Sequence, residues 1–99
     1  MKFLITWQIH EGKIQSTLNL FSKMPAEHEQ ALMGENVELL GRWHDLVRGT
    51  GAAVYEAESA EALSAYSLNW SQYMDLDISV VVDDSTAREI GSTISAETE

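Results

Sequence analysis

The feature that most constrains the fold is a change of periodicity that recurs along these 99 residues. Apolar and polar side chains alternate, as in half-buried strands, over residues 3–10, 37–44, 52–57 and 74–82. Between the first two strands, and again between the last two, apolar residues recur at helical spacings of three and four. These residues are Ile14, Leu18 and Phe21 in the first helix and Leu63, Tyr66, Trp70 and Tyr73 in the second.

Local signals indicate where the elements begin and end. The first helix should stop before Pro25, because the residue preceding a proline disfavours helix. Pro25 can then begin a short, polar helix over residues 26–33. Ser59 is a plausible N-cap for the second main helix, and Asp83-Asp84-Ser85 can cap a final short helix over residues 86–90.

The order β-α-β-β-α-β is typical of an α+β, ferredoxin-like fold, in which helices cover one face of a four-stranded antiparallel sheet. We expect a single domain over residues 1–90, followed by a short acidic and frayed tail over residues 91–99. The first and third strands are expected to be central and parallel to each other. The second and fourth strands should lie at the edges.

The charge balance excludes several classes of partner. Sixteen acidic residues face six basic ones, which gives a net charge of −10. Binding to nucleic acid depends on clustered Lys and Arg, so we expect neither nucleic acid nor a membrane surface as partner. The absence of cysteine excludes thiolate metal sites and a Cys nucleophile. The N-terminal sequence lacks the features of a signal peptide or membrane span, so a cytoplasmic location is expected.

Strand alternation divides the sheet into two faces. The face expected to meet the helices carries Phe3, Ile5, Trp7, Ile9, Val37, Leu39, Trp43, Leu76, Ile78 and Val80. The other face is mixed, with Leu4, Thr6, Gln8, His10, Leu40, Arg42, His44, Val54, Asp77, Ser79 and Val81. A mixed face suggests a cover, and the simplest cover is a second copy of the chain. We therefore predict a homodimer through this face.

Arg42 and His44 are the strongest candidates for a site. A charge in an interface is costly unless it is paired, so Arg42 could be an interface ion pair with Asp77 or Glu38. Alternatively, the two side chains line a polar cavity. His44 would then act as an acid or base near neutral pH, and Arg42 would orient an anionic or enolate-like oxygen.

Further residues could contact a small-molecule ligand. Thr6 and Gln8 share the predicted face of Arg42 and are candidate polar contacts. The three tryptophans Trp7, Trp43 and Trp70 are explained most simply as core, but they are also natural walls for an aromatic ligand between sheet and helices.

We expect no metal and no cofactor. The three histidines lack the spacing of a metal-binding motif. His10 and His44 are expected to end antiparallel strands at opposite ends of the sheet, where one ion could not reach both. A haem site would need a clearly placed proximal histidine.

Several segments resemble a bacterial family, domain of unknown function 3303. They are MKFLITW, LLGRWHDL, GTGAAVYEAESAEAL, NW near the end of the second helix, and LDISVVVDD. The resemblance runs from Met1 to about Ile90, and GRWH is its most specific part. This family resembles a branch of the dimeric α/β barrels, whose protomers are ferredoxin-like. The wider group includes cofactor-independent monooxygenases, muconolactone-type isomerases, haem-using enzymes and ligand-sensing regulators, and the resemblance transfers no catalytic residue.

Two functions remain open at this point. The first is a cofactor-independent enzyme, monooxygenase- or isomerase-like, that acts on a small aromatic metabolite through Arg42 and His44. The second is a non-catalytic ligand-binding or interaction homodimer. A His44 ring that opens on a cavity shared with Arg42 would favour the enzyme, whereas a ring sealed against a partner would favour the second function.

Overall fold

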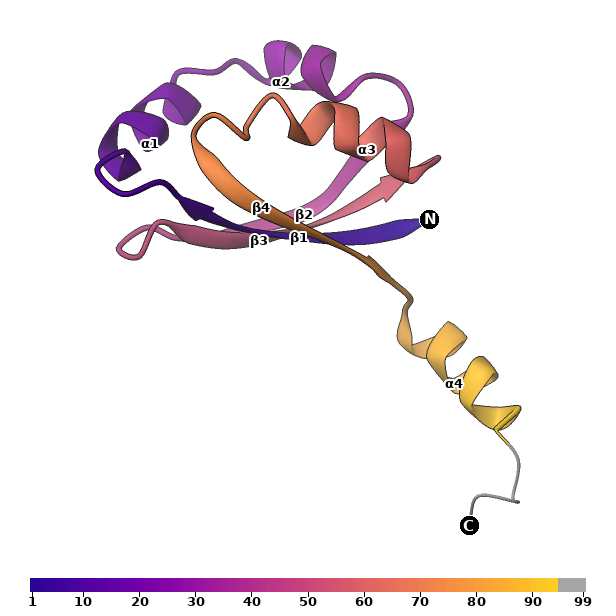
Figure 1. Ribbon diagram of the computed structural model, residues 1–99. Helices are drawn as coiled ribbons and strands as arrows, with labels where there is room; N and C mark the ends of the chain where they lie inside the picture. The colour runs from indigo at the N-terminus through magenta and orange to yellow at the C-terminus, as the bar shows by residue number, and fades with distance from the viewer. Residues whose placement is uncertain (95–99) are drawn as a thin grey trace.

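The computed structural model describes residues 1–94 and has four strands and four helices in the order β-α-α-β-β-α-β-α (Figure 1). The elements are β1 (Lys2–Ile9), α1 (Ile14–Ser22), α2 (Ala26–Met33), β2 (Val37–Asp45), β3 (Thr50–Ala57), α3 (Ala60–Ser67), β4 (Met74–Val81) and α4 (Asp84–Ser92). The ferredoxin-like α+β fold is confirmed, because the strands and the main helices follow one another in the predicted β-α-β-β-α-β order, with α2 and α4 as the two additional short helices.

The strands form one sheet in the order β2-β3-β1-β4, and all neighbours are antiparallel. The expectation that the central strands β1 and β3 are parallel is therefore wrong. The helical connection between β1 and β2 makes these two strands parallel to each other, with β3 inserted between them. The C-terminal ends of β1 and β2 consequently lie at the same end of the sheet.

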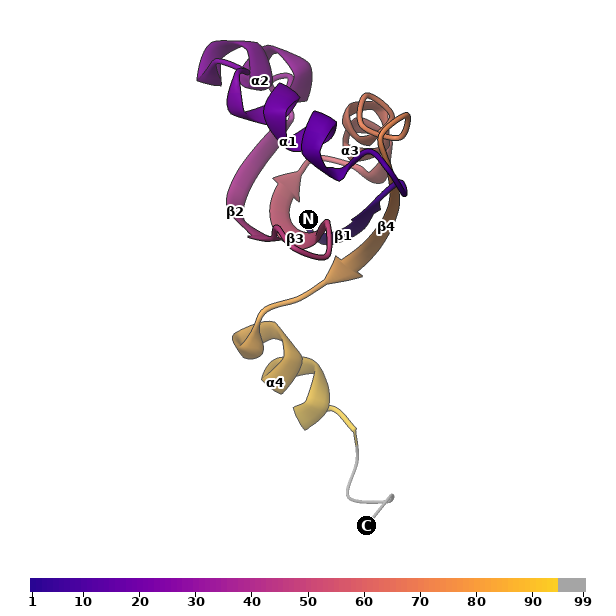
Figure 2. The same cartoon turned by 90° about the vertical axis from the view of Figure 1, so that its left-hand side faces the viewer.

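Helices α1, α2 and α3 cover one face of the sheet, and the other face has no cover from residues 1–94 (Figures 1 and 2). The side chains buried between sheet and helices are Phe3, Ile5, Ile9, Val37, Ala53, Tyr55, Ala57, Leu63, Tyr66, Trp70 and Met74. Ser59 caps α3 as predicted, since its hydroxyl accepts a hydrogen bond of 3.2 Å from the Ala62 N–H. Helix α3 ends at Ser67, earlier than its apolar stripe predicts, and Trp70 and Tyr73 lie in the turns that follow.

A β-bulge interrupts β2 and changes which residues face the helices. The register with β3 shifts between Leu39, which lies opposite Tyr55, and Gly41, which lies opposite Val54. Leu40 is the additional residue. Since an extra residue reverses the alternation beyond it, every side chain of β2 after Leu40 points to the face opposite the predicted one.

The consequence is an exchange of faces within GRWH. Arg42 lies opposite Ala53, a buried residue of the helix-covered face, and therefore faces the helices. His44 follows on the same side. Trp43 turns to the uncovered face, where it remains 65% exposed. The predicted faces of Arg42, Trp43 and His44 are thus wrong, and the bulge is the physical reason.

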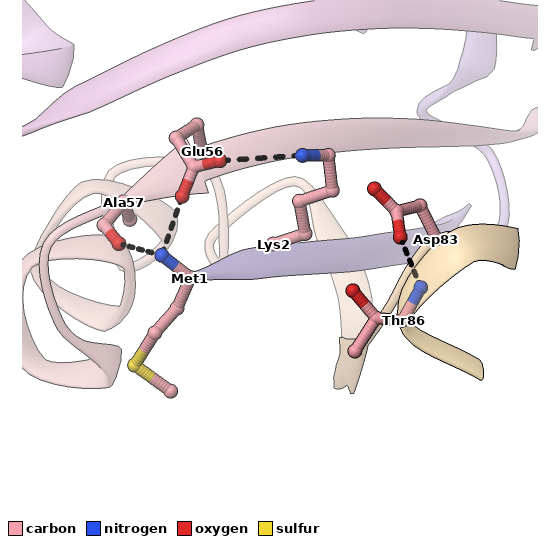
Figure 3. Close-up of polar contacts among 6 residues, drawn as sticks. All are labelled: Met1, Lys2, Glu56, Ala57, Asp83 and Thr86. Atoms are coloured by element: carbon pink, nitrogen blue, oxygen red, sulfur yellow. Dashed lines mark hydrogen bonds and ion pairs between the residues drawn. The ribbon is translucent and has the colours of Figure 1, made fainter. Parts of the chain in front are cut away.

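Helix α4 is separate from the body. Asp83 caps it as predicted, because its carboxylate accepts a 2.9 Å hydrogen bond from the Thr86 N–H (Figure 3). The same figure shows the ion pair between Lys2 of β1 and Glu56 of β3. The helix continues beyond residue 90 to Ser92, has no buried residue and projects away from the sheet (Figures 1 and 2). The radius of gyration, 16.4 Å, accordingly exceeds the value of about 13 Å expected for this length. The rest of the predicted frayed tail, residues 95–99, lies outside the described residues.

No helix within residues 1–94 combines the length and the apolar composition that crossing a membrane requires.

Candidate functional site

A cavity of about 60 Å³ lies between the helix-covered face of the sheet and helices α1 and α3. Its lining is mainly apolar. The aromatic lining residues are Trp7, Phe21, Tyr55, Tyr66 and Trp70, and the polar ones are Thr17, Arg42, His44 and Ser67. An apolar pocket with a few convergent polar groups is the usual form of a small-molecule site.

Arg42 reaches this cavity from β2 and is held there on two sides. Its Nη1 lies 2.6 Å from Oε1 of Glu29 in α2, and both side chains are only 15% exposed. The contact is an ion pair whose geometry does not meet the alignment of a hydrogen bond. The guanidinium carbon also lies 4.8 Å from the centre of the Phe21 ring, in a cation–π arrangement. Burial opposes the charge on Arg42, but Glu29, together with Tyr55 and Tyr66, outweighs burial, and the pKa of Arg42 is raised.

His44 lies between two aromatic rings at the exposed side of the cavity. Its ring centre is 5.5 Å from that of Trp7 and 5.4 Å from that of Phe21. Partial burial lowers the pKa of His44 below 6.5, the Arg42 charge lowers it further, and Glu29 opposes the change. The imidazole is therefore neutral at neutral pH, which is the form that accepts a proton.

Two tyrosines and a tryptophan form the opposite wall. Trp70 donates a 3.3 Å hydrogen bond from its indole N–H to the Tyr66 hydroxyl. Tyr55 and Tyr66 pack with ring centres 5.7 Å apart. Burial, with Tyr66 beside it, raises the pKa of Tyr55 well above its usual value of 10.0. The Tyr55 hydroxyl therefore stays protonated near neutral pH and can donate a hydrogen bond.

Gly51 creates the space for the tryptophan wall. A Cβ atom at this position would lie 2.1 Å from Cζ2 of Trp7 and 2.6 Å from the carbonyl oxygen of Trp43. Only a glycine lets the Trp7 indole lie flat over β3, beside His44 on the neighbouring strand.

Thr17 of α1 contributes an unusual polar group. Its side chain lines the cavity and the residue is only 3% exposed. Its hydroxyl oxygen is buried and has no hydrogen-bond partner among residues 1–94. Buried hydroxyls are normally paired, so an unpaired one on a residue that lines the cavity calls for an explanation.

The sheet divides the predicted site residues into two groups. Trp7, Trp70, Arg42 and His44 meet in the cavity. The others, Thr6, Gln8 and Trp43, lie on the uncovered face and could contact only a ligand bound there. Gln8 donates hydrogen bonds of 3.2 and 3.0 Å to the carbonyl oxygens of Ile9 and Arg48.

His10 differs from its predicted place. Because β1 and β2 are parallel, His10 and His44 lie toward the same end of the sheet rather than at opposite ends. His10 pairs with Asp75, with 3.2 Å between Nε2 and Oδ1. Within the described part of the chain, no three His, Asp or Glu side chains come together as a metal ion would need.

Three site residues were not identified from the sequence. Glu29 belongs to a helix that was predicted to be polar, and nothing in the sequence distinguishes it from Glu27. Phe21 was assigned to the core stripe of its helix. Thr17 carried a usable signal, since it is a polar residue at a stripe position, three after Ile14 and four before Phe21.

Comparison with solved structures supports the fold. One similar structure is that of TftG, a 5-chloro-2-hydroxyhydroquinone dehydrochlorinase from Burkholderia phenoliruptrix AC1100, solved in complex with 2,5-dihydroxybenzoquinone. The TM-score is 0.62 and the sequence identity 14%, and the aligned region covers 87% of this chain and 98% of TftG. Protein Atu4242 from Agrobacterium tumefaciens has a TM-score of 0.50 and 14% identity, covering 85% and 96%. A NIPSNAP family protein from the same organism has a TM-score of 0.50 and 12% identity, with the same coverage. At these identities the likeness shows the ferredoxin-like fold alone.

The sequence comparisons give the family. No curated protein matches the chain. Residues 1–95 match a family described as a domain of unknown function, DUF3303, which agrees with the resemblance carried by GRWH and its neighbouring strands. The chain therefore belongs to the DUF3303 family.

Proposed function

We propose that this protein binds a small aromatic metabolite in the cavity between sheet and helices and removes a proton from it without a cofactor. The observation that carries the proposal is the meeting of Arg42 and His44 in one aromatic-lined cavity. The cavity is smaller than the roughly 150 Å³ that accepts benzene in other proteins, so side chains at its mouth must move to admit even a single ring.

His44 is the base in this proposal. It is neutral near pH 7 and lies beside the aromatic walls that would hold a ring. It takes a proton from a hydroxyl, or from a carbon next to a carbonyl, and the negative charge develops on the ligand oxygen. Arg42 stabilises that oxygen as a fixed cation, and Glu29 fixes the position of Arg42.

The same first step fits the two reaction types suggested by the wider fold group. In an isomerase the proton returns to another atom of the substrate. In a cofactor-independent monooxygenase the anion reacts at carbon with dioxygen, the second substrate. One oxygen atom becomes a new ring carbonyl and the other leaves as water with two substrate hydrogens, so the substrate itself supplies the electrons.

A chromogenic phenol tests the proposal. 4-Nitrophenol absorbs visible light as the phenolate, so its ionisation on binding can be followed while a pH indicator reports protons released to weakly buffered solution. We expect wild type to bind it as the phenolate with no net proton release, because His44 takes the proton. His44→Phe keeps an aromatic ring there and should release one proton per phenolate formed.

The outcomes separate catalysis from binding. Proton release by the wild type would exclude His44 as the base. Binding of the neutral phenol alone would leave a ligand-binding module. No binding at all would remove the aromatic-ligand proposal.

We also propose that the uncovered face forms a homodimer, and a specific observation favours this. Trp43 is 65% and Leu40 46% exposed on this face. A contiguous apolar patch on a protein surface usually marks an interface. A standard interface covers about 800 Å² per partner.

A further inference from the structure

The buried hydroxyl of Thr17 is not used by the proposed proton transfer. A helical threonine can satisfy its hydroxyl on the carbonyl four residues earlier, which here belongs to Lys13. That carbonyl accepts the Thr17 backbone N–H at 2.9 Å, and the side-chain hydroxyl has no partner within residues 1–94. Valine has the same shape and would avoid the cost of an unpaired hydroxyl.

Thr17 is more deeply buried in the cavity than the other two polar residues of the proposed site, Arg42 and His44. Thr17 is 3% exposed, whereas His44 at the other side of the cavity is an exposed residue. Aromatic side chains of Trp7, Phe21 and Trp70 line the space as well. Ser67, Tyr55 and Tyr66 are buried as deeply as Thr17, but the Ser67 hydroxyl already donates a 2.8 Å hydrogen bond to the Leu63 carbonyl oxygen. Among residues 1–94, the Thr17 hydroxyl is the deep polar group of the lining without a partner, and Arg42 and His44 lie nearer the mouth.

We infer that the Thr17 hydroxyl binds an oxygen substituent at the inner end of the ligand. The substrate class is then a single six-membered ring with two hydroxyl or keto oxygens. One oxygen lies deep beside Thr17, and the other lies beside Arg42 and His44. This inference rests on the proposed function and specifies its substrate. A threonine hydroxyl both donates and accepts, so it suits either kind of oxygen.

The charges favour neutral oxygens over a carboxylate. Glu29 already balances Arg42 at 2.6 Å, and both side chains are largely buried. A ligand carboxylate would bring its own charge and compete with Glu29 for the guanidinium, so that one of the two anions would lose its partner. A phenolate formed in the site leaves its proton on His44, and the resulting imidazolium becomes its additional partner. A hydroxyl or keto group accepts from Arg42 without that conflict.

Hydroquinone and phenol are the matched probes, because they differ only in the second hydroxyl. Dissociation constants are measured from amide chemical shifts of the full chain, for wild type, Thr17→Val and Thr17→Ser. In wild type, hydroquinone should bind about fivefold more tightly than phenol, the effect of one neutral hydrogen bond. The ratio should fall to about one in Thr17→Val and be retained in Thr17→Ser.

Stability serves as the control for a purely structural role. Thr17→Val should unfold at the same or a higher denaturant concentration than wild type, so a lost preference cannot be ascribed to unfolding. Thr17→Ala provides a second variant with the same expected loss of preference should the valine be poorly accommodated.

The results distinguish this inference from the function on which it rests. If both probes shift the amides of the cavity but bind with equal affinity in wild type, or keep their ratio in Thr17→Val and Thr17→Ala, the role of Thr17 is refuted and the site stands. If neither probe shifts those amides, the proposed function and this inference fall together.

Discussion

On the helix-covered face of the sheet, β2 presents an arginine and a histidine; on the uncovered face, the same strand presents a leucine and a tryptophan. Arg42 is 15% exposed and paired, whereas Trp43 is 65% exposed. A fold stabilised by burial alone would have the opposite arrangement, with the indole inside and the charge outside. The difference suggests that the covered face of β2 is organised around a ligand and the uncovered face around another protein surface.

The largest effect is expected from breaking the ion pair on the covered face. Glu29→Gln leaves the Arg42 charge largely buried without its partner and should destabilise the protein by about 3 kcal/mol in urea denaturation. Glu27→Gln is the matched control, because Glu27 is an exposed residue of the same first helical turn of α2. It should change stability by no more than about 0.5 kcal/mol. Equal effects of the two substitutions would mean that helix electrostatics, and not the pair, stabilises this region.

Substitutions at two glycines, one on each face of the sheet, compare the packing of the two faces. Gly51→Ala places a methyl group against the Trp7 ring and a backbone oxygen, so we expect a loss of about 2 kcal/mol and weaker binding of phenol in the cavity. At Gly41 the added methyl would meet Cη2 of Trp43 at 2.6 Å, but this exposed indole can swing aside. Gly41→Ala should therefore cost less than about 1 kcal/mol and leave phenol binding unchanged. A larger loss at Gly41 would show that the Trp43 indole is held in place.

The two faces also separate what the sequence could and could not predict. Alternation over residues 3–10 placed Trp7 correctly, since β1 has no irregularity. The same rule failed for Arg42 and His44, because it assumes an unbroken register and Leu40 breaks it. A signal was present, since an isolated glycine inside a strand pattern, here Gly41, is typical of a bulge.

Glu29 shows a second limit of prediction from the sequence. Its pairing with Arg42 depends on how α2 lies over the edge strand β2, and that placement is a tertiary property with no local pattern. Capping residues, by contrast, act within one turn, so Ser59 and Asp83 were identified correctly.

The uncovered face is tested through association. Trp43→Ser should raise the dissociation constant of the proposed dimer at least tenfold, about 1.4 kcal/mol, because buried tryptophans contribute strongly to interfaces. Val47→Ser is the control, since Val47 is also exposed but lies in the turn between β2 and β3. Sedimentation should give twice the protomer mass of 11.0 kDa for wild type and for Val47→Ser. A wild type of protomer mass at micromolar concentration would contradict the dimer.

The smallest effect concerns the charge of His44 and returns to the covered face. Its folded-state pKa is lowered by burial and then by Arg42, from 6.5 in the unfolded chain. Below that value the unfolded chain binds more protons than the folded one, so stability falls as the pH decreases through the window between the two pKa values. His44→Phe keeps an aromatic ring between Trp7 and Phe21 but cannot titrate.

The measurement is urea denaturation of wild type and His44→Phe at a series of pH values from about 5 to 8, with the difference between the two curves isolating His44. We expect wild type to gain stability relative to the variant as the pH rises through the window just below 6.5. The opposite slope would mean that the attraction of Glu29 exceeds burial and the repulsion of Arg42. His44 would then be protonated in the folded protein, and a protonated imidazole could donate to a ligand oxygen but could not serve as the base.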